Sequence, residues 1–298
     1  KYHARKAAEA MKKIKEIYKN RISIWAKYSG YHIIQRYGKK YIAPKENAVL
    51  LWYDPVEKEE MLISDVLNTG KIIADAKNGE EMIAAALDFV SKYGLLGWMP
   101  SLPVNPYFYL ESKVLLPENE YFLFSSTTKD TEKYMEQFQV EPNGEKLLGV
   151  GQEQGRSPVY DLVFSKNYCE PVDWIIPFLQ EMFEHFRTKE MLEDHSYEPW
   201  EKMILRKKIE SFYHSGVPYV LRYNPVPGAC WVFDSLKMVA ETACIVALGQ
   251  EENQVSICKH CGKYFYREDV RSAYCSHRCR NQYHVYQSRK RKRMEEND

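Results

Sequence analysis

The chain has 298 residues, of which 45% are hydrophobic and 14% aromatic, enough to fill the cores of one large and one small domain or of two medium ones. A charged fraction of 28% and a mean hydropathy of −0.53 fit a globular protein and argue against a membrane protein. The longest uncharged stretch, residues 93–110, contains Pro100, Pro103 and Pro106, which exclude a membrane-spanning helix there.

Charge is distributed unevenly, although the whole chain carries a formal net charge of only +1. Residues 258–298 hold 11 Lys and Arg against 5 Asp and Glu, whereas the other 257 residues hold 31 against 36. An acidic body with a basic C-terminal segment predicts that this segment binds a polyanion. The chain begins with Lys1 rather than Met, so the sequence leaves open whether further residues precede it.

The first expected element is helical. Residues 1–28 are rich in Ala and Lys, and the apolar stripe of the predicted helix consists of Met11, Ile14, Ile17 and Tyr18. Residues 31–64 show a shorter and mixed pattern, in which residues 49–53 are the best strand candidate.

Helical periodicity is clearest in four later segments, which are residues 79–93, 171–190, 198–214 and 234–248. Asn78 can cap the first of them, and Gly94 suits its C-terminal end. Pro177 is expected to start or to kink the second, and Gly249 ends the last. Residues 98–160 contain many Pro and Gly turn signals and are predicted to be loop-rich.

Four of the seven cysteines, Cys258, Cys261, Cys275 and Cys279, lie near the C-terminus with spacings of two, thirteen and three residues. Four thiolates at such spacing are typical of one structural zinc ion, because the protein then fills all four tetrahedral positions. A redox motif would need one pair only, and His260 and His277 are the alternatives as ligands. The other three cysteines are scattered, which fits a reducing cytosol.

The residues around these cysteines predict a treble-clef finger. Cys258-x-x-Cys261-Gly262 is a knuckle, and Tyr264-Phe265-Tyr266 is expected to form the first strand of a hairpin that turns near residues 268–269. Cys275 and Cys279 are four residues apart, so on a helix their sulfurs would share one face. The predicted fold is therefore mainly α with minor β (α+β). It combines a mostly helical domain over residues 1–250, carrying the loop-rich insertion at 98–160, with a zinc finger over 255–298.

A basic helix is expected to follow the finger. Its inner face would consist of Cys279, Tyr283 and Tyr286, with Arg280, His284, Gln287 and Arg291 turned outward. An outer face of this composition is typical of a helix that contacts the grooves or phosphates of a nucleic acid. The candidate contacts are Arg278, Arg280, His284, Gln287, Arg289, Lys290, Arg291, Lys292 and Arg293. The alternative interpretation is a solvated, disordered basic tail.

A further pattern of the C-terminal segment consists of Cys258, Cys261, Phe265, Tyr274, Cys275, Ser276, Cys279 and Asn281. In this pattern the segment resembles a bacterial family of transcriptional regulators, the CGNR zinc-finger proteins. Arg280 and Gln282 stand where the family has Gly and Arg. In that family the finger follows a mostly helical N-terminal domain. The resemblance implies a cytoplasmic, nucleoid-associated regulator that binds double-stranded DNA.

Two other classes of function compete with this interpretation. The same finger could serve an adaptor that binds RNA, the ribosome or a protein, since fold does not settle function. A treble-clef nuclease would need a histidine on the hairpin, where this chain has Tyr264-Phe265-Tyr266, and we therefore expect no enzyme. The body is expected to form a homodimer or to sense a small molecule, and no membrane partner is expected.

Overall fold

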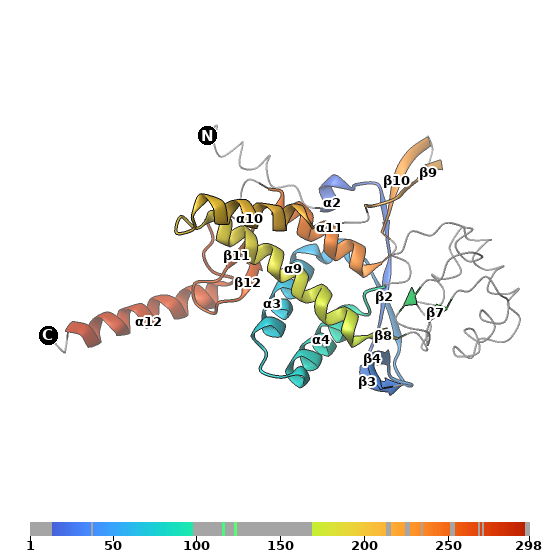
Figure 1. Ribbon diagram of the computed structural model, residues 1–298, viewed down its shortest axis with the longest axis horizontal. Helices are drawn as coiled ribbons and strands as arrows, with labels where there is room; N and C mark the ends of the chain where they lie inside the picture. Colours follow the sequence, from blue (N-terminus) through green and yellow to red (C-terminus); the bar gives the residue numbers. More distant parts are fainter. Residues whose placement is uncertain are drawn as a thin grey trace, which may run out of the picture.

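The computed structural model describes residues 14–36, 38–97, 115–116, 122–123, 169–212, 216–223, 227–233, 235–250, 254–267, 269 and 271–295 (Figure 1). These residues form a mixed α+β structure, as the sequence predicts at this level. No helix in the described part of the chain has the length and apolar character needed to cross a membrane.

Helices form one side of the molecule in Figure 1, and most strands lie on the other. The helices are α2 (Ile14–Ile17), the 3-10 turn η1 (Val56–Lys58), α3 (Glu59–Asp75), α4 (Gly79–Tyr93), α9 (Val172–Glu193), α10 (Pro199–Glu210), α11 (Leu236–Leu248) and α12 (His277–Glu295). The strands before the cysteines are β1 (Arg21–Ser23), β2 (Trp25–Tyr28), β3 (Tyr31–Arg36), β4 (Lys39–Pro44), β5 (Leu50–Tyr53), β6 (Leu115–Leu116), β7 (Phe122–Leu123), β8 (Glu170–Pro171), β9 (Tyr219–Tyr223) and β10 (Pro227–Phe233).

The core lies where α3 packs on α9, with α4 and α11 beside this pair. Gly70 on α3 permits the close approach. A Cβ atom there would lie 2.3 Å from the backbone oxygen of Leu179 and 2.6 Å from the Cβ of Phe183. The apolar face of α3, including Leu62 and Val66, is completely buried. Helix α3 therefore forms a rigid support, and its opposite side is available for other elements.

The strands form small sheets at the edge of this core. β1 pairs in parallel with β10, which pairs in antiparallel fashion with β9. β2 pairs with β5, β3 and β4 form a hairpin that β8 extends, and β6 pairs with β7. Trp25 on β2 is 2% exposed, and its Nε1 donates a hydrogen bond to the Leu95 carbonyl at 3.0 Å. This contact holds the sheets against the end of α4.

Of the helix predicted over residues 1–28, the described part is helical only in α2, which ends at Ile17; the prediction is wrong beyond it, because β1 and β2 follow. Pairing of β1 with β10, about two hundred residues later, overrides the local helical preference. The sequence pattern also does not predict α3. The strand predicted at 49–53 is confirmed by β5.

The four later helices are confirmed: α4 has the predicted ends, and α9, α10 and α11 have shifted ends. Asn78 caps α4 as predicted, its side chain accepting a hydrogen bond from the Glu81 N–H at 2.9 Å. Pro177 lies inside α9 rather than at its start. The predicted loop-rich segment 98–160 lies outside the described residues apart from β6 and β7.

Candidate metal centre and basic helix

A short hairpin carries the first two cysteines. Strands β11 (Val255–Ile257) and β12 (Tyr264–Tyr266) pair in antiparallel fashion, and the knuckle between them contains Cys258 and Cys261. The Gly262 N–H donates to the Cys258 carbonyl at 2.9 Å, and Gly262 has a φ of 68°, a conformation that disfavours a side chain. The predicted knuckle is present. Tyr264–Tyr266, however, is the second strand of this hairpin and not the first strand of a later one, since its partner precedes the knuckle.

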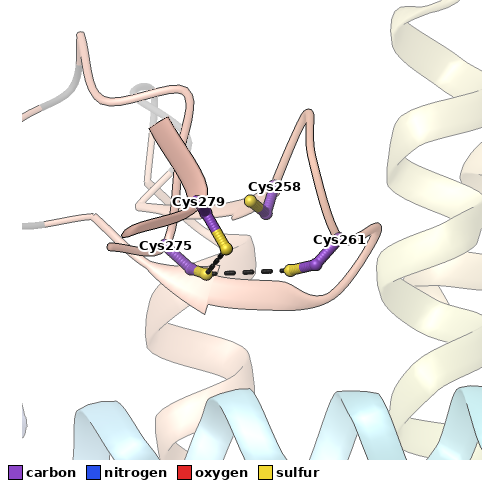
Figure 2. Close-up of side chains that lie close together, drawn as sticks. All are labelled: Cys258, Cys261, Cys275 and Cys279. Atoms are coloured by element: carbon purple, nitrogen blue, oxygen red, sulfur yellow. Dashed lines mark hydrogen bonds between the residues drawn. The ribbon is translucent and has the colours of Figure 1, made fainter. Parts of the chain in front are cut away.

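The four cysteine sulfurs converge on one point (Figure 2), all lying within 4.8 Å of one another. The Sγ of Cys275 lies 3.7 Å from that of Cys261 and 3.4 Å from that of Cys279. Four sulfurs bonded at about 2.3 Å to a tetrahedral zinc ion would be about 3.8 Å apart. The arrangement is therefore close to that of a four-cysteine metal site, and the four residues could hold one metal ion.

The second pair of cysteines is arranged differently from the prediction. Cys275 precedes α12 and only Cys279 lies in its first turn, so the two sulfurs do not share a helical face. Ser276 starts the helix, because its Oγ accepts a hydrogen bond from the Cys279 N–H at 3.2 Å. The turn before the helix, rather than helical periodicity, brings the sulfurs together.

The electrostatics of the cluster favour a bound cation. Burial raises the pKa of the Cys258 thiol, but backbone hydrogen bonds from Cys261, Cys275 and His260 outweigh burial and bring this pKa to about 6. Burial and the neighbouring cysteines raise the pKa of Cys275 to about 12. The thiolate of Cys258 therefore forms readily, whereas that of Cys275 is disfavoured unless a cation neutralises its charge.

The hairpin is fixed to the body by polar side chains of α3. Asn68 makes two backbone hydrogen bonds with Tyr264, accepting its N–H and donating to its carbonyl, both at 2.8 Å. Ser64 Oγ accepts the Tyr266 N–H at 3.1 Å, and Lys71 Nζ donates to the Gly262 carbonyl at 3.1 Å. Ser64, Asn68 and Lys71 follow one another at about one helical turn, so they lie on one face of α3. This face supplies hydrogen-bond partners to the edge of β12 that does not pair with β11.

Tyr264 continues this attachment into the core. Its side chain is 4% exposed and its ring lies 5.9 Å from that of Phe183 on α9. Its hydroxyl donates a hydrogen bond to Glu190 Oε2 at 3.1 Å. Sequence analysis missed Ser64, Asn68, Lys71 and Glu190, because no local pattern marks contacts between residues so far apart in the chain.

Helix α12 extends away from the rest of the molecule (Figure 1) and packs extensively on no described helix or strand. The candidate contacts Arg278, Arg280, His284, Arg289, Lys290, Lys292 and Arg293 are exposed, and Gln287 is half-buried. The side chain of Arg291 lies outside the described residues.

The predicted inner face of α12 is correct for Cys279 and Tyr283 and wrong for Tyr286. The Tyr283 ring lies 5.4 Å from that of Tyr274, in the segment before the helix. Tyr286 is 62% exposed, because the helix has by then passed the end of the finger.

Comparisons with protein-family models, with curated proteins and with solved structures find no match to this chain. The family resemblance therefore stays a prediction. The cysteine cluster, the hairpin attached to α3 and the exposed basic helix are the features from which a function can be argued.

Proposed function

We propose that the chain is a nucleic-acid-binding regulator whose ligand is double-stranded DNA and whose binding element is α12. One observation carries this proposal. A helix of 19 residues with seven Lys and Arg and one Glu projects from the molecule, while its first turn carries a member of the cysteine cluster. A charged helix that is held at one end and has most of its described side chains exposed suits a groove of DNA.

In this proposal the cluster is a structural zinc site in a treble-clef finger. Cys258, Cys261, Cys275 and Cys279 would hold the ion, and zinc supplies a cross-link between the hairpin and the helix. The protein provides all four sulfurs, so the site has a structural role, and we propose no catalysis there. The attachment of the hairpin to α3 means that the cross-link would fix the direction of α12 relative to the body.

The alternative functions differ in the partner of α12. RNA or an acidic protein would also be attracted to its cations, whereas a nuclease is disfavoured because the hairpin strand β12 carries no histidine. Duplex DNA is favoured because the isolated, straight basic helix offers a rigid surface over several turns. Dimer formation or ligand sensing by the body, and a cytoplasmic location, stay predictions.

A matched pair of double variants tests the proposal. Arg289→Gln with Lys290→Gln removes two cations from α12, and Arg206→Gln with Lys207→Gln removes the same exposed dipeptide from α10. Fluorescence anisotropy with duplex DNA, single-stranded RNA and an acidic peptide gives affinity and its salt dependence. We expect the α12 variant alone to bind DNA more weakly and to lose roughly two units of the salt slope. Equal effects of the two variants, or preference for RNA or peptide, would contradict duplex DNA as the ligand.

A further inference from the structure

A groove lies at the base of α12, beside the cysteine cluster. It has a volume of about 640 Å³ and is bounded by the segment before the helix (residues 269 and 271–276), by the first two turns of α12 and by Phe265 and Tyr266 of β12. The groove is partly open to solvent. An open trough of this kind suits a chain that passes through it better than a small molecule that must be enclosed.

Cationic and imidazole side chains line this groove from both sides. Arg271 comes from the segment before the helix, while His277, Arg280 and His284 come from α12. Neither arginine forms an ion pair with an acidic side chain in the described part of the chain. The groove therefore presents two guanidinium groups whose charge is uncompensated within these residues.

The acidic residue of the groove, Asp269, stabilises the turn. Its Oδ1 accepts a hydrogen bond from the Arg271 backbone N–H at 3.0 Å, and its carbonyl accepts one from the Ser272 N–H at 2.8 Å. These bonds hold the backbone of Arg271 in place beside the helix. The carboxylate is thus engaged by the turn and leaves the guanidinium of Arg271 available for an anion.

Aromatic packing fixes the position of Tyr274 and His284 in the lining of the groove. Tyr274 lies with its ring centroid 5.4 Å from that of Tyr283 and 6.0 Å from that of His284. Tyr274 and His284, which line the groove, are thus packed together with Tyr283 before any ligand arrives. Guanidinium groups bind phosphate oxygens through paired N–H donors, and aromatic faces suit the sugars and bases next to a phosphate. This combination favours a nucleic-acid strand over an acidic peptide.

We infer that this groove is a phosphate-binding site which receives a backbone phosphate of the nucleic acid between Arg271 and Arg280. The inference rests on the proposed function and adds a defined anchor point, with Arg271 as a contact outside the helix. The strand that meets α12 would enter the groove at the first turns of the helix. The anchor would fix the register of the helix on the strand, since phosphate contacts position a protein on its nucleic acid.

The zinc-loaded full chain tests this site through Arg271→Gln, with Arg222→Gln on the exposed strand β9 as the matched control. Loss of one charged contact should weaken DNA binding about tenfold and lower the salt slope by roughly one, whereas the control should bind as the unchanged protein does. A second test uses a series of DNA duplexes in which single phosphates are replaced by neutral methylphosphonates. At one position the replacement should weaken binding of the unchanged protein, and the same replacement should not weaken binding of the Arg271→Gln variant any further.

The outcomes separate the site from the wider function. Unchanged DNA affinity of Arg271→Gln, together with weaker binding after removal of Arg289 and Lys290, would overturn the groove and leave α12 as the DNA-binding element. Unchanged affinity of both variants would overturn both proposals. Binding of a polyglutamate peptide as tightly as DNA, lost in Arg271→Gln, would also overturn the phosphate assignment.

Discussion

Strand β12 and helix α12 belong to the same C-terminal segment, yet they relate to the rest of the molecule in opposite ways. β12 is buried against α3, and its backbone is hydrogen-bonded by Ser64 and Asn68. Most described side chains of α12 are exposed, and the helix extends away from the body. The cysteine cluster joins the two, because Cys258 and Cys261 lie on the knuckle, Cys275 lies just before α12 and Cys279 lies in its first turn.

This difference indicates that the cysteine cluster matters differently for the hairpin and for α12. The hairpin has its own attachment to the body, so its position does not depend on metal alone. The helix has few other contacts, so its direction depends on the sulfur cross-link. Metal is therefore expected to matter most for the element that would bind nucleic acid.

The largest effect is expected from Cys275→Ser, which would separate the two elements. The variant should lose its one zinc ion per chain, because three cysteine ligands hold the ion less tightly than four. The loss is large, since binding of a structural zinc ion contributes about 10–16 kcal/mol of folding free energy in isolated finger peptides. Amide exchange should become fast in α12 and remain slow in β12, which α3 still holds. Elemental analysis of the unchanged protein provides the control. Absence of zinc from that protein, or equal loss of protection in both elements, would contradict this account.

The next largest effect concerns α12 alone. Replacement of Arg289, Lys290, Arg291, Lys292 and Arg293 by Gln should weaken binding to all DNA sequences alike and lower the salt slope by roughly four to five. Thermal stability should stay nearly unchanged, because exposed charges contribute little to folding. Salt-dependent anisotropy and a thermal melt measure the two quantities. Full affinity after neutralisation would point to a protein partner for α12.

A smaller effect is expected in β12 from the substitution Asn68→Ala. The backbone N–H and carbonyl of Tyr264 would lose their partners, at a cost of about 1–3 kcal/mol for buried groups left unsatisfied. Protection of β12 against amide exchange should fall while zinc remains bound. The exposed Asn47 provides the control as Asn47→Ala. Equal protection of β12 in both variants would show that Asn68 does not hold the hairpin.

The smallest effect is expected from two tyrosine substitutions, one in β12 and one in α12. Tyr264→Phe removes the hydroxyl that donates to Glu190 but keeps the ring beside Phe183, and should cost about 1 kcal/mol in the free energy of unfolding. Tyr286→Phe on α12 should cost nothing measurable, because that side chain is 62% exposed. Urea unfolding of both variants gives the two free energies of unfolding. A larger loss of stability for Tyr286→Phe than for Tyr264→Phe would contradict the view that β12 is attached to the body and α12 is not.

Local signals allowed much of the site to be predicted from the sequence. The cysteine spacing, the glycine after the knuckle and the basic composition of α12 are all contiguous in the chain, and Asn78 and Gly94 mark the ends of α4 in the same way. Such features depend on chemistry within a few residues, so no knowledge of the fold is required.

Most of the errors arise from contacts between residues that are distant in the sequence. Trp25 belongs to a strand because β2 pairs with β5, and no local pattern shows this pairing. Asn68 and Tyr264 are separated by 196 residues, so the attachment of the hairpin to α3 was not foreseeable. Tyr286 was misplaced because helical periodicity extends the inner face of α12 beyond the point where the finger ends.

Amide hydrogen exchange of the zinc-loaded full chain, measured with and without duplex DNA, tests the central claim most directly. The account predicts that DNA slows exchange in the first turns of α12 and in residues 271–276, while β12 is slow in both states. Slowed exchange confined to another surface, such as β9 and β10, with none in α12, would contradict the claim that this helix is the nucleic-acid-binding element.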